Sequence, residues 1–436
     1  MNVTTRLHTG NSLSKTAPPG PESGGHIRLP GKFAGKPSAF GLSMDTLSKH
    51  TMLVGGTGCG KTTLFYHFVS QIKRSMTNDD VMIIFDTKGD FHSKFFDKSC
   101  DHVIGNSSQY STESVKWNIY REIIADGWDE RNFVVNTQEI CRSFFEERMK
   151  TTNPFFPNAA RDLLAAIIIA FIREGIKDPN IKPEFFYNNK LKEFLDVADA
   201  RMILGLIGNS PDANAIMSYI SGDNAQSQGV LAEMHSVVRE ILIGVFADKG
   251  GFSMREFVKN KGRKSIFIEY DLAIGSTLTP VYRLLFDLAL KEALGRNKPQ
   301  GSVYLICDEF KLLPHLRHIE DGVNFGRSLG VKVFAGIQSI EQLYEIYGQS
   351  RGRNIAAGFS SVYAFRSNDS TTREFISGLF GKNIVMEEYQ LMDNKIVEEK
   401  RNGQTVEDWD LYNLKVGEAV VGLPFSPPFR FHFDMY

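Results

Sequence analysis

The sequence has few cysteines, no surplus of charge and no long apolar run. Four cysteines stand among 436 residues, at positions 59, 100, 141 and 307, and none forms a C-x-x-C pair. This spacing argues against a disulfide framework or a cysteine-rich zinc site and favours a reducing compartment. Lysine and arginine number 50 against 51 aspartate and glutamate, so the net charge is −1. A broadly basic nucleic-acid coat is excluded, and any nucleic-acid surface must be local.

Membrane-spanning and secretory signals are also lacking. Residues 1–26 contain no apolar stretch of the kind found in a signal peptide. The longest apolar run, Leu163–Ile172, has ten residues, whereas a membrane-spanning helix needs about 20. We therefore expect this run to be a buried helix. The composition predicts a cytoplasmic protein, or one that a separate partner holds at the inner face of the cell membrane.

The order of polar and apolar segments predicts an α/β fold. Residues 1–39 are rich in Gly, Pro, Ser, Thr and Lys, which predicts a flexible polar leader. Short apolar runs that end in polar residues follow at 51–54, 81–85, 265–268, 303–307, 332–337 and 361–365. Most of these runs are continuous rather than alternating, which is typical of strands in a parallel sheet covered by helices on both faces.

A helical insertion is predicted in the middle of the chain. The strand signal disappears between 127 and 254, where helical patterns such as Ala159–Ile172 and Leu231–Phe246 take over. We therefore expect an all-α domain at 127–254 that divides one α/β domain into parts at 40–126 and 255–436. Near the C-terminus, Asn402-Gly403 suggests a hairpin turn or loop tip.

A phosphate-binding motif follows the first apolar run. Residues 55–62 fit G-x-x-x-x-G-K-[ST], with a strand expected before them and a helix after them. The expected nucleotide-binding residues are Gly55, Gly56, Thr57, Gly58, Cys59, Gly60, Lys61, Thr62 and Thr63. The glycines let backbone N–H groups turn towards phosphates, and the helix N-terminus adds its positive dipole end. Lys61 would reach the β- and γ-phosphates and Thr62 would bind Mg²⁺, so ATP and Mg²⁺ are the expected cofactors.

Acidic residues at two strand ends are candidates for metal and water binding. Asp86 follows the run 81–85, and Asp308-Glu309 follows the run 303–307. The pair is preferred, because Asp308 can hold Mg²⁺ through water while Glu309 orients and deprotonates the attacking water. Asp86 has no second acid beside it, and a cap on the following turn explains it equally well.

Three further residues are weaker candidates. Gln338 closes the run 332–337, where its amide could contact the γ-phosphate or the water, although a polar strand end is the plainer explanation. Arg327 could act as a finger in a neighbouring subunit's site, although a surface arginine is the default for any one arginine. Cys59 is best explained as a small residue in a small slot, although a thiol near a helix N-terminus can have a lowered pKa.

Together these motifs resemble one family. They are His50–Thr62, Asp86-Thr87-Lys88-Gly89-Asp90, Asp308-Glu309-Phe310, Gly326-Arg327-Ser328, Gln338–Leu343 and Tyr347-Gly348. In this order they resemble the coupling ATPases of conjugation and type IV secretion, the TraG/TraD group, which are relatives of the FtsK/HerA DNA pumps. The resemblance runs from about Gly41 to Gly422. Its most specific part is the acidic pair followed by Arg327 and then Gln338-Ser339, because a P-loop alone is common.

The resemblance implies a RecA-like motor that hydrolyses ATP, assembles as a ring, a homo-hexamer when active, and moves DNA through its pore. It implies the following roles: Lys61 and Thr62 hold the phosphates and Mg²⁺, Asp308 the metal and Glu309 the water, Gln338 senses the γ-phosphate, and Arg327 acts across the subunit interface. The all-α domain would recognise a relaxase–DNA complex or another secretion substrate. Family members usually begin with transmembrane helices, which this sequence lacks, so a separate membrane anchor protein is a further expected partner.

Two other functions stay open at this point. A soluble FtsK/HerA-like DNA pump for segregation, processing or defence would carry the same motifs. A nucleotide-gated adaptor would bind ATP and recruit a protein through the helical domain without moving DNA, but Glu309 and Gln338 argue against it because both suit hydrolysis. The lysines at 88, 94 and 259–264 could face DNA, but solvated loops explain them better. No DNA-contact residue is therefore assigned.

Overall fold

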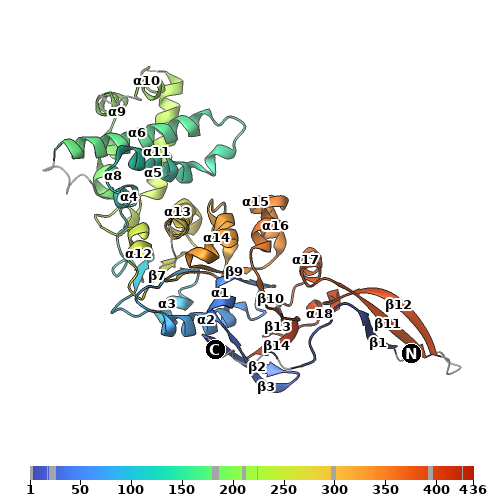
Figure 1. Ribbon diagram of the computed structural model, residues 1–436. Helices are drawn as coiled ribbons and strands as arrows, with labels where there is room; N and C mark the ends of the chain where they lie inside the picture. The colour runs from blue at the N-terminus through green and yellow to red at the C-terminus, as the bar shows by residue number, and fades with distance from the viewer. Residues whose placement is uncertain are drawn as a thin grey trace. The chain divides into compact units, whose positions relative to one another are not determined.

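The computed structural model describes residues 3–16, 18, 26–178, 186–208, 213–222, 224–295, 301–390, 396–424 and 426–436. The chain forms two compact units (Figure 1). Met1–Phe85 and Arg296–Tyr436 make up one, here called the split unit. Asp86–Gly295 makes up the other, here called the inserted unit. No strand lies among the described residues of 127–254.

A mixed sheet organises the split unit. Its strand order is β3-β2-β14-β13-β10-β4-β9-β8-β5. The strands are β2 Ile27–Phe33, β3 Lys36–Leu42, β4 Thr51–Val54, β5 Val81–Asp86, β8 Val303–Cys307, β9 Val331–Ile337, β10 Ser361–Phe365, β13 Glu418–Gly422 and β14 Phe429–Phe433. The five from β10 to β5 are parallel and every residue in them is buried, which confirms the strands predicted from continuous apolar runs. The other four form an antiparallel flank that the sequence did not predict.

Helices cover both faces of the parallel part. The helices of the split unit are α1 Met44–Ser48, α2 Lys61–Ser75, α14 Ile319–Phe325, α15 Ile340–Tyr347, α16 Gln349–Ala357, α17 Ser370–Phe380 and α18 Asp408–Tyr412, with short turns η3 Phe310–Leu312 and η4 Gly326–Leu329. The connection through α2 runs from β4 to β5, towards one end of the strand order. The connections through α14 and through α15 and α16 run from β8 to β9 and from β9 to β10, towards the other end. Because such crossovers are right-handed, α2 lies on one face and α14–α16 on the opposite face (Figure 1). Each parallel strand ends at the same edge, where ligands bind in sheets of this type.

The position of α2 is set by one apolar face. Its buried apolar residues are Leu64, Phe65, Phe68, Val69 and Ile72. Phe68 packs on Phe334 of β9 and Tyr363 of β10, with ring centroids 5.3 Å and 5.7 Å apart. This spacing is the helical pattern predicted from the sequence. The packing holds the N-terminus of α2 at the carboxyl edge of the sheet.

The flexible leader predicted at 1–39 is wrong for most of its described part. β1 (Val3–Thr9) pairs with a later strand, and β2 and β3 form a hairpin whose β2 pairs with β14. Phe40 of this hairpin is fully buried and packs edge to face on Phe429 and Phe431. Leu29 is also fully buried, while Arg28 beside it is exposed. This alternation is the pattern of an antiparallel strand with one wet face. Residues 17 and 19–25 of the expected leader lie outside the described residues.

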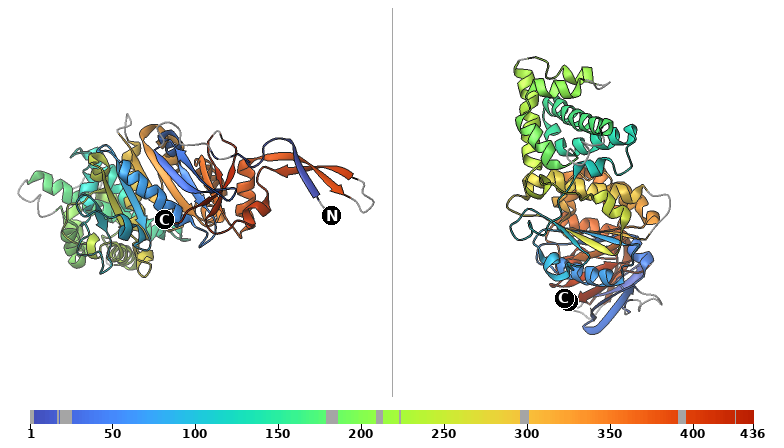
Figure 2. Two further views of the ribbon diagram at one scale, coloured as in Figure 1. Left: turned by 90° about the horizontal axis from the view of Figure 1, so that it is seen from below. Right: turned by 90° about the vertical axis from the view of Figure 1, so that its left-hand side faces the viewer.

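A second, three-stranded antiparallel sheet in the split unit has the order β1-β11-β12. β11 spans Lys382–Gln390 and β12 spans Ile396–Gln404, and Figure 2 shows them as a long hairpin beside β1. We call this sheet the arm. Asn402 and Gly403 lie within β12, opposite Ile384 and Asn383. The hairpin turn predicted at Asn402-Gly403 is therefore wrong.

The inserted unit combines a parallel strand pair with many helices. The strands are β6 His102–Ile104 and β7 Lys264–Glu269. The helices are α3 Asp90–Phe95, α4 Ile119–Ile123, α5 Glu130–Phe145, α6 Phe155–Lys177, α8 Asn188–Val197, α9 Ala200–Ile207, α10 Ala213–Met217, α11 Ala225–Ile241, α12 Met254–Asn260 and α13 Gly275–Leu294, with η1 Arg148–Lys150 and η2 Gly244–Phe246. Of the described helices, α6 alone is long and apolar enough to cross a membrane, but 67% of its most apolar 18-residue stretch is buried in the fold. The buried helix predicted around Leu163–Ile172 is thus confirmed.

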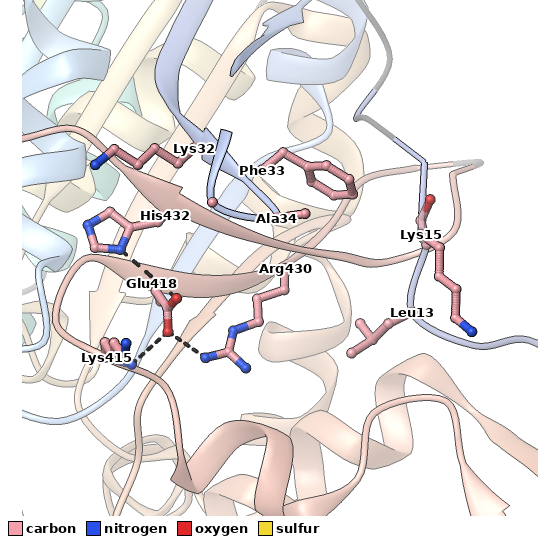
Figure 3. A pocket seen from close by; sticks show the side chains of 11 residues that line it. Leu13, Lys15, Lys32, Phe33, Ala34, Lys415, Glu418, Arg430 and His432 are labelled. Atoms are coloured by element: carbon pink, nitrogen blue, oxygen red, sulfur yellow. Dashed lines mark hydrogen bonds and ion pairs between the residues drawn. The ribbon is translucent and has the colours of Figure 1, made fainter. Parts of the chain in front are cut away.

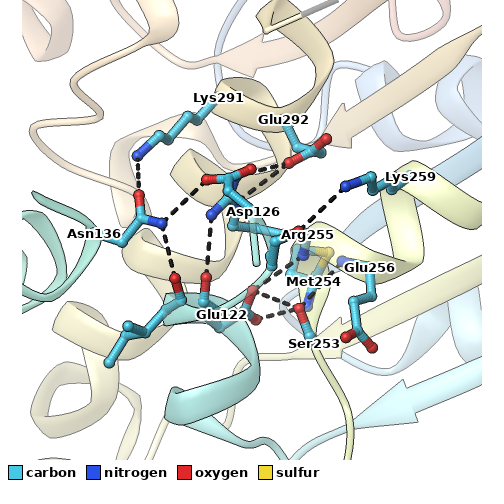
Figure 4. A network of polar contacts seen from close by, with 12 residues as sticks. Glu122, Asp126, Asn136, Ser253, Met254, Arg255, Glu256, Lys259, Lys291 and Glu292 are labelled. Carbon is cyan, nitrogen blue, oxygen red and sulfur yellow. Dashed lines mark hydrogen bonds and ion pairs between the residues drawn. The ribbon is translucent and has the colours of Figure 1, made fainter. Parts of the chain in front are cut away.

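A buried carboxylate joins the segments that lead into and out of the helices of the inserted unit (Figure 4). Glu122 of α4 accepts hydrogen bonds from the Ser253 hydroxyl at 2.7 Å and from the backbone N–H of Met254 at 2.6 Å. The indole of Trp117 donates to the same carboxylate at 2.9 Å. Burial raises the pKa of Glu122, although these donors favour the charged form. The carboxylate fastens the start of α12 to α4.

Arg255 extends this network. Its side chain is 4% exposed and its guanidinium lies 2.7 Å from Asp126 and 3.0 Å from Glu292. The same guanidinium donates to the backbone carbonyl of Glu122 at 3.1 Å. Figure 4 shows these groups converging from α4 and the loop after it, from α12 and from α13. Removing the guanidinium would leave the largely buried Glu292 carboxylate, which is 14% exposed, without its cation, whereas the Asp126 carboxylate is 38% exposed.

Candidate active site

The loop between β4 and α2 is held by backbone contacts from the residue that follows β10 and the residue that precedes β13. The N–H of Gly56 donates to the carbonyl of Arg366 at 2.8 Å, just beyond β10. The N–H of Gly417, just before β13, donates to the carbonyl of Cys59 at 2.9 Å. Gly60 caps α2 with φ of 112°, and a Cβ there would lie 3.1 Å from Gly417. Only glycine suits that conformation and that approach. Neither the Arg366 nor the Gly417 contact was predicted, since backbone contacts leave no motif.

Lys61 lies inside this loop. The residue is 8% exposed, and its ammonium donates to the carbonyl oxygens of Gly55 at 2.7 Å and Gly56 at 3.0 Å. It opens the first turn of α2, which also contains Thr62 and Thr63. An ammonium group at a helix N-terminus inside a glycine-rich loop concentrates positive potential where phosphates would sit. The residues present therefore fit a nucleotide polyphosphate.

Cys59 is a buried side chain of the same loop. It is 6% exposed, and burial raises the pKa of its thiol. The nearby Lys61 charge opposes this shift without reversing it. This environment supports the small-residue explanation over a reactive thiolate.

Thr62 and Asp308 form the first polar contact of the site. The Thr62 hydroxyl donates to Oδ2 of Asp308 at 2.6 Å. Asp308 follows β8, which lies two strands from β4 in the sheet. Carboxylate and hydroxyl oxygens are hard ligands of the kind that Mg²⁺ prefers. These two residues fit a Mg²⁺ ion bound beside the phosphate loop.

Glu309 and Gln338 form the second contact. The Gln338 amide donates to both carboxylate oxygens of Glu309, at 3.1 Å and 2.9 Å. The Thr57 hydroxyl lies 3.5 Å from the Gln338 carbonyl oxygen, at the far limit of a hydrogen bond. Glu309 and Gln338 are half-buried at the ends of adjacent strands, β8 and β9. Their contact places a candidate base, an amide and the phosphate loop at one sheet edge.

Arg327 lies away from this cluster. It belongs to η4, immediately before β9, whereas Gln338 follows the end of β9. Seven strand residues at about 3.3 Å each separate the two positions by roughly 20 Å. The Arg327 guanidinium pairs with Asp45 at 2.7 Å, and both side chains are more than half exposed. Within one chain, Arg327 therefore cannot reach a nucleotide at the loop.

Asp86 and the lysines after 258 serve the inserted unit. Asp86 accepts backbone hydrogen bonds from His92 at 2.8 Å and Lys88 at 3.4 Å, which is the capping role weighed from the sequence, and burial raises its pKa. Lys261 is 6% exposed, and the Lys264 ammonium lies 5.0 Å from the ring centre of Phe257. These lysines are thus partly built into the fold rather than forming a solvated loop.

The comparison with known families decides the affiliation of the chain. The family described as the type IV secretion-system coupling protein DNA-binding domain matches residues 38–407. The chain belongs to this coupling protein family. The coupling protein TraD of Escherichia coli strain K12 is 22% identical over 344 residues, which are 78% of this chain and 44% of TraD. The chain therefore spans less than half the length of this curated relative.

Solved structures share the fold. The conjugative coupling protein TrwBdeltaN70 in complex with sulphate is 22% identical, with a TM-score of 0.74 over 99% of this chain and 95% of that one. TrwB in complex with ADP and Mg²⁺ is also 22% identical, with a TM-score of 0.70 over 95% and 90%. VirB4 of Thermoanaerobacter pseudethanolicus is 12% identical, with a TM-score of 0.56 over 96% and 98%. The predicted RecA-like P-loop fold with an all-α domain is thereby confirmed.

Proposed function

We propose that this coupling protein hydrolyses ATP to translocate DNA and delivers conjugative DNA, as a relaxase–DNA complex, to a type IV secretion channel. The observation that carries the proposal is the contact of Gln338 with both oxygens of Glu309, next to the Thr62–Asp308 pair. Nucleotide binding alone needs the loop and a metal ligand. Hydrolysis requires, in addition, a carboxylate held in place beside them to accept a proton from the attacking water. The TrwB structure with ADP and Mg²⁺ supports the choice of cofactors.

Each residue then has a separate part in the reaction. Lys61 and the N–H groups of the loop bind the β- and γ-phosphates, while Thr62 and Asp308 hold Mg²⁺, which neutralises phosphate charge when bound. Glu309 accepts a proton from the attacking water. Gln338 keeps the Glu309 carboxylate oriented and would sense the γ-phosphate of a bound nucleotide. Because one amide group binds both carboxylate oxygens, rotation of Glu309 away from the water is restricted.

Arg327 is proposed to complete the site of a neighbouring copy. Its place at the amino edge of β9 keeps it from its own phosphate loop but leaves the guanidinium more than half exposed to a partner. In a ring, the amino edge of one sheet can face the carboxyl edge of the next. An arginine supplied in this way stabilises transition-state charge. We therefore propose an active homo-hexamer around DNA.

The helices at 127–254 are proposed as the domain that recognises the relaxase or another secretion substrate. Exposed apolar side chains there support a binding role: Val197 is 70% exposed and Met202 is 46% exposed. Apolar groups left in water on neighbouring helices suit a protein partner. The proposed location is cytoplasmic, at the inner face of the membrane, with a separate anchor protein as docking partner.

The ATPase rate with and without single- and double-stranded DNA tests this function. The wild-type rate should rise with DNA and increase cooperatively with protein concentration, as expected if DNA promotes assembly. Glu309→Gln should abolish the rate and leave nucleotide binding intact. Hydrolysis that ignores both kinds of DNA would overturn the translocase and favour an adaptor that recruits a protein.

A further inference from the structure

A basic cavity lies in the antiparallel flank of the split unit (Figure 3). Its volume is about 560 Å³. The charged or titratable residues that line it are Lys15, Lys32, Lys415, Glu418, Arg430 and His432. They come from the segment after β1, from β2, from the loop before β13 and its first residue, and from β14. The cavity is therefore assembled from distant parts of the chain.

Strand register aligns three of these side chains. Glu418 of β13 lies opposite His432 of β14, and His432 lies opposite Lys32 of β2. Residues opposite one another in neighbouring strands point to the same face of a sheet. The next residue of β13, Ala419, lies opposite Phe365 at the carboxyl end of β10. The cavity is thus at the same sheet edge as the phosphate loop.

The positive charge of the cavity is not balanced by the protein. Glu418 is the one carboxylate among the lining residues, and it is already engaged by Arg430 at 2.5 Å and by the Lys415 backbone N–H at 2.9 Å. Within the described part of the chain, the ammonium groups of Lys15, Lys32 and Lys415 pair with no carboxylate. Since the whole chain has a net charge of −1, this is a local concentration of positive charge. Such a concentration attracts an anion with several charges.

The side chains that line the cavity suit phosphate groups, whatever bases those phosphates connect. Lysines are strongly hydrated point charges on flexible stems, which bind phosphate without the fixed geometry of an arginine fork. The arginine present is already committed to Glu418. Several lysines that line one cavity from different segments of the chain can contact successive phosphates of a backbone. This pattern is typical of binding that depends on charge and not on base identity.

Backbone contacts connect the cavity to the phosphate loop. Lys415 lies two residues before Gly417, whose N–H donates to the Cys59 carbonyl at 2.9 Å. The N–H of Phe433, the residue after His432, donates to the Gly417 carbonyl at 2.9 Å. An anion bound by Lys415 and His432 would therefore act on both segments that hold this glycine against the loop.

We propose that this cavity binds phosphate groups of the DNA backbone and transmits DNA binding to the ATP site through Gly417. The proposal rests on the proposed function and names where that function contacts DNA. A free polyphosphate offers the same chemistry as a DNA strand. DNA is the source favoured here, because the family that the chain belongs to is described by its DNA-binding domain.

The test is a pair of double variants with equal loss of charge. Lys32→Gln with Lys415→Gln removes two cations of the cavity. Lys382→Gln with Lys400→Gln removes two exposed lysines of the arm, in the same unit but outside the cavity. DNA binding is measured by fluorescence anisotropy of a labelled duplex over a range of salt concentrations. The DNA-stimulated and DNA-free ATPase rates are measured in parallel.

The cavity variant should bind DNA roughly tenfold more weakly, and its log Kd against log salt slope should fall by about two, near 0.9 for each lost contact. Its DNA-stimulated rate should fall, while its DNA-free rate should match wild type. The arm variant should resemble wild type in both assays. Equal behaviour of the two variants would overturn the proposal.

A second arm of the test separates the two sources of phosphate. Binding of inorganic tripolyphosphate is measured by calorimetry in a Lys61→Ala background, which removes the phosphate loop as a competing site. Loss of tripolyphosphate binding in the cavity variant with unchanged DNA affinity would show a free polyphosphate site and contradict the DNA proposal. If wild type neither binds DNA nor responds to it, the proposed function fails, whereas tripolyphosphate binding still reports on the cavity by itself.

Discussion

The carboxylates of Glu122 and Glu309, one in each unit, differ in how many hydrogen bonds they accept from the protein, and this difference separates a structural carboxylate from a candidate catalytic one. Glu122 in the inserted unit is fully buried and accepts hydrogen bonds from four groups, those of Trp117, Ser253, Met254 and Arg255. Glu309 in the split unit is half-buried, and both of its oxygens contact a single amide. A carboxylate can accept about four hydrogen bonds. All of the acceptor capacity of Glu122 is therefore taken up by groups of the protein, whereas Glu309 can still accept a hydrogen bond from water.

The largest expected effect comes from removing the proton acceptor of the split unit. Glu309→Gln keeps the side-chain shape but cannot take a proton, so kcat for ATP hydrolysis should fall about 10²–10⁴-fold. ATP affinity, measured by equilibrium binding, should stay close to wild type. Glu122→Gln is the matched variant, and its kcat per folded molecule should be unchanged. A similar loss of kcat in both variants would erase the proposed difference between the two carboxylates.

Breaking the saturated network should affect stability instead of turnover. Arg255→Met leaves Asp126 and Glu292 without their buried cation, so the inserted unit should lose about 3–5 kcal/mol of unfolding free energy. Urea unfolding followed by hydrogen exchange would locate the loss in that unit. Arg121→Met, which breaks the half-exposed pair with Glu256, should cost below about 1 kcal/mol. Equal costs would mean that burial does not strengthen the network.

A smaller effect is expected from a buried histidine of the split unit. Burial, together with the nearby Lys332 and Arg327 charges, lowers the pKa of His50 to about 4. Its Nδ1 accepts the N–H of Val333 at 3.1 Å, which requires the neutral ring. Between pH 6.5 and 4 the unfolded chain binds a proton that the folded chain does not, so stability should fall by about 3 kcal/mol as pH drops through this range.

Replacing His50 tests that assignment. His50→Asn keeps a hydrogen-bond acceptor and removes the titration, so unfolding free energy measured from pH 7 to 4 should depend less steeply on pH than in wild type. Any loss at pH 7 reports packing and not ionisation. An unchanged pH dependence would show that another group is responsible.

The smallest effect is expected at the loop thiol. Cys59→Ala should change ATP affinity only a few-fold, because the thiol is a small, buried and uncharged group that only fills space in the loop. Alkylation of wild type should be slow, since burial raises the thiol pKa, but complete modification should block nucleotide binding by filling the loop. ATP should protect the thiol. Full alkylation of Cys59 with unchanged binding would contradict its place in the site.

The sequence predicted the site best for residues whose position follows from a single neighbouring strand. Lys61, Asp308 and Gln338 each follow or precede a continuous apolar run, so their places at the sheet edge could be inferred locally. The Gln338–Glu309 hydrogen bond could not be inferred from the strand pattern alone, because it depends on β9 lying next to β8. The contact of Gly417 with the phosphate loop joins residues that are distant in sequence and leaves no pattern at all.

The arm shows why other parts were missed. Glu387 lies opposite Glu399, and Glu388 lies opposite Glu398. Like charges opposite one another disfavour strand pairing, so the local sequence suggests a loop. Arg6 of β1, at the other end of the chain, lies 3.0 Å from Glu398 and 3.6 Å from Glu388. The pairing is thus stabilised by a residue that no local window contains.

The most direct test of the account is whether one active site needs two copies of the chain. Glu309→Gln and Arg327→Ala should each be nearly inactive alone with DNA, since one lacks the base and the other the arginine. In an equimolar mixture, some interfaces combine an intact Glu309 with an intact Arg327 from a neighbour, so ATP hydrolysis should rise well above the sum of the separate rates. A mixture that stays at that sum would contradict the shared site.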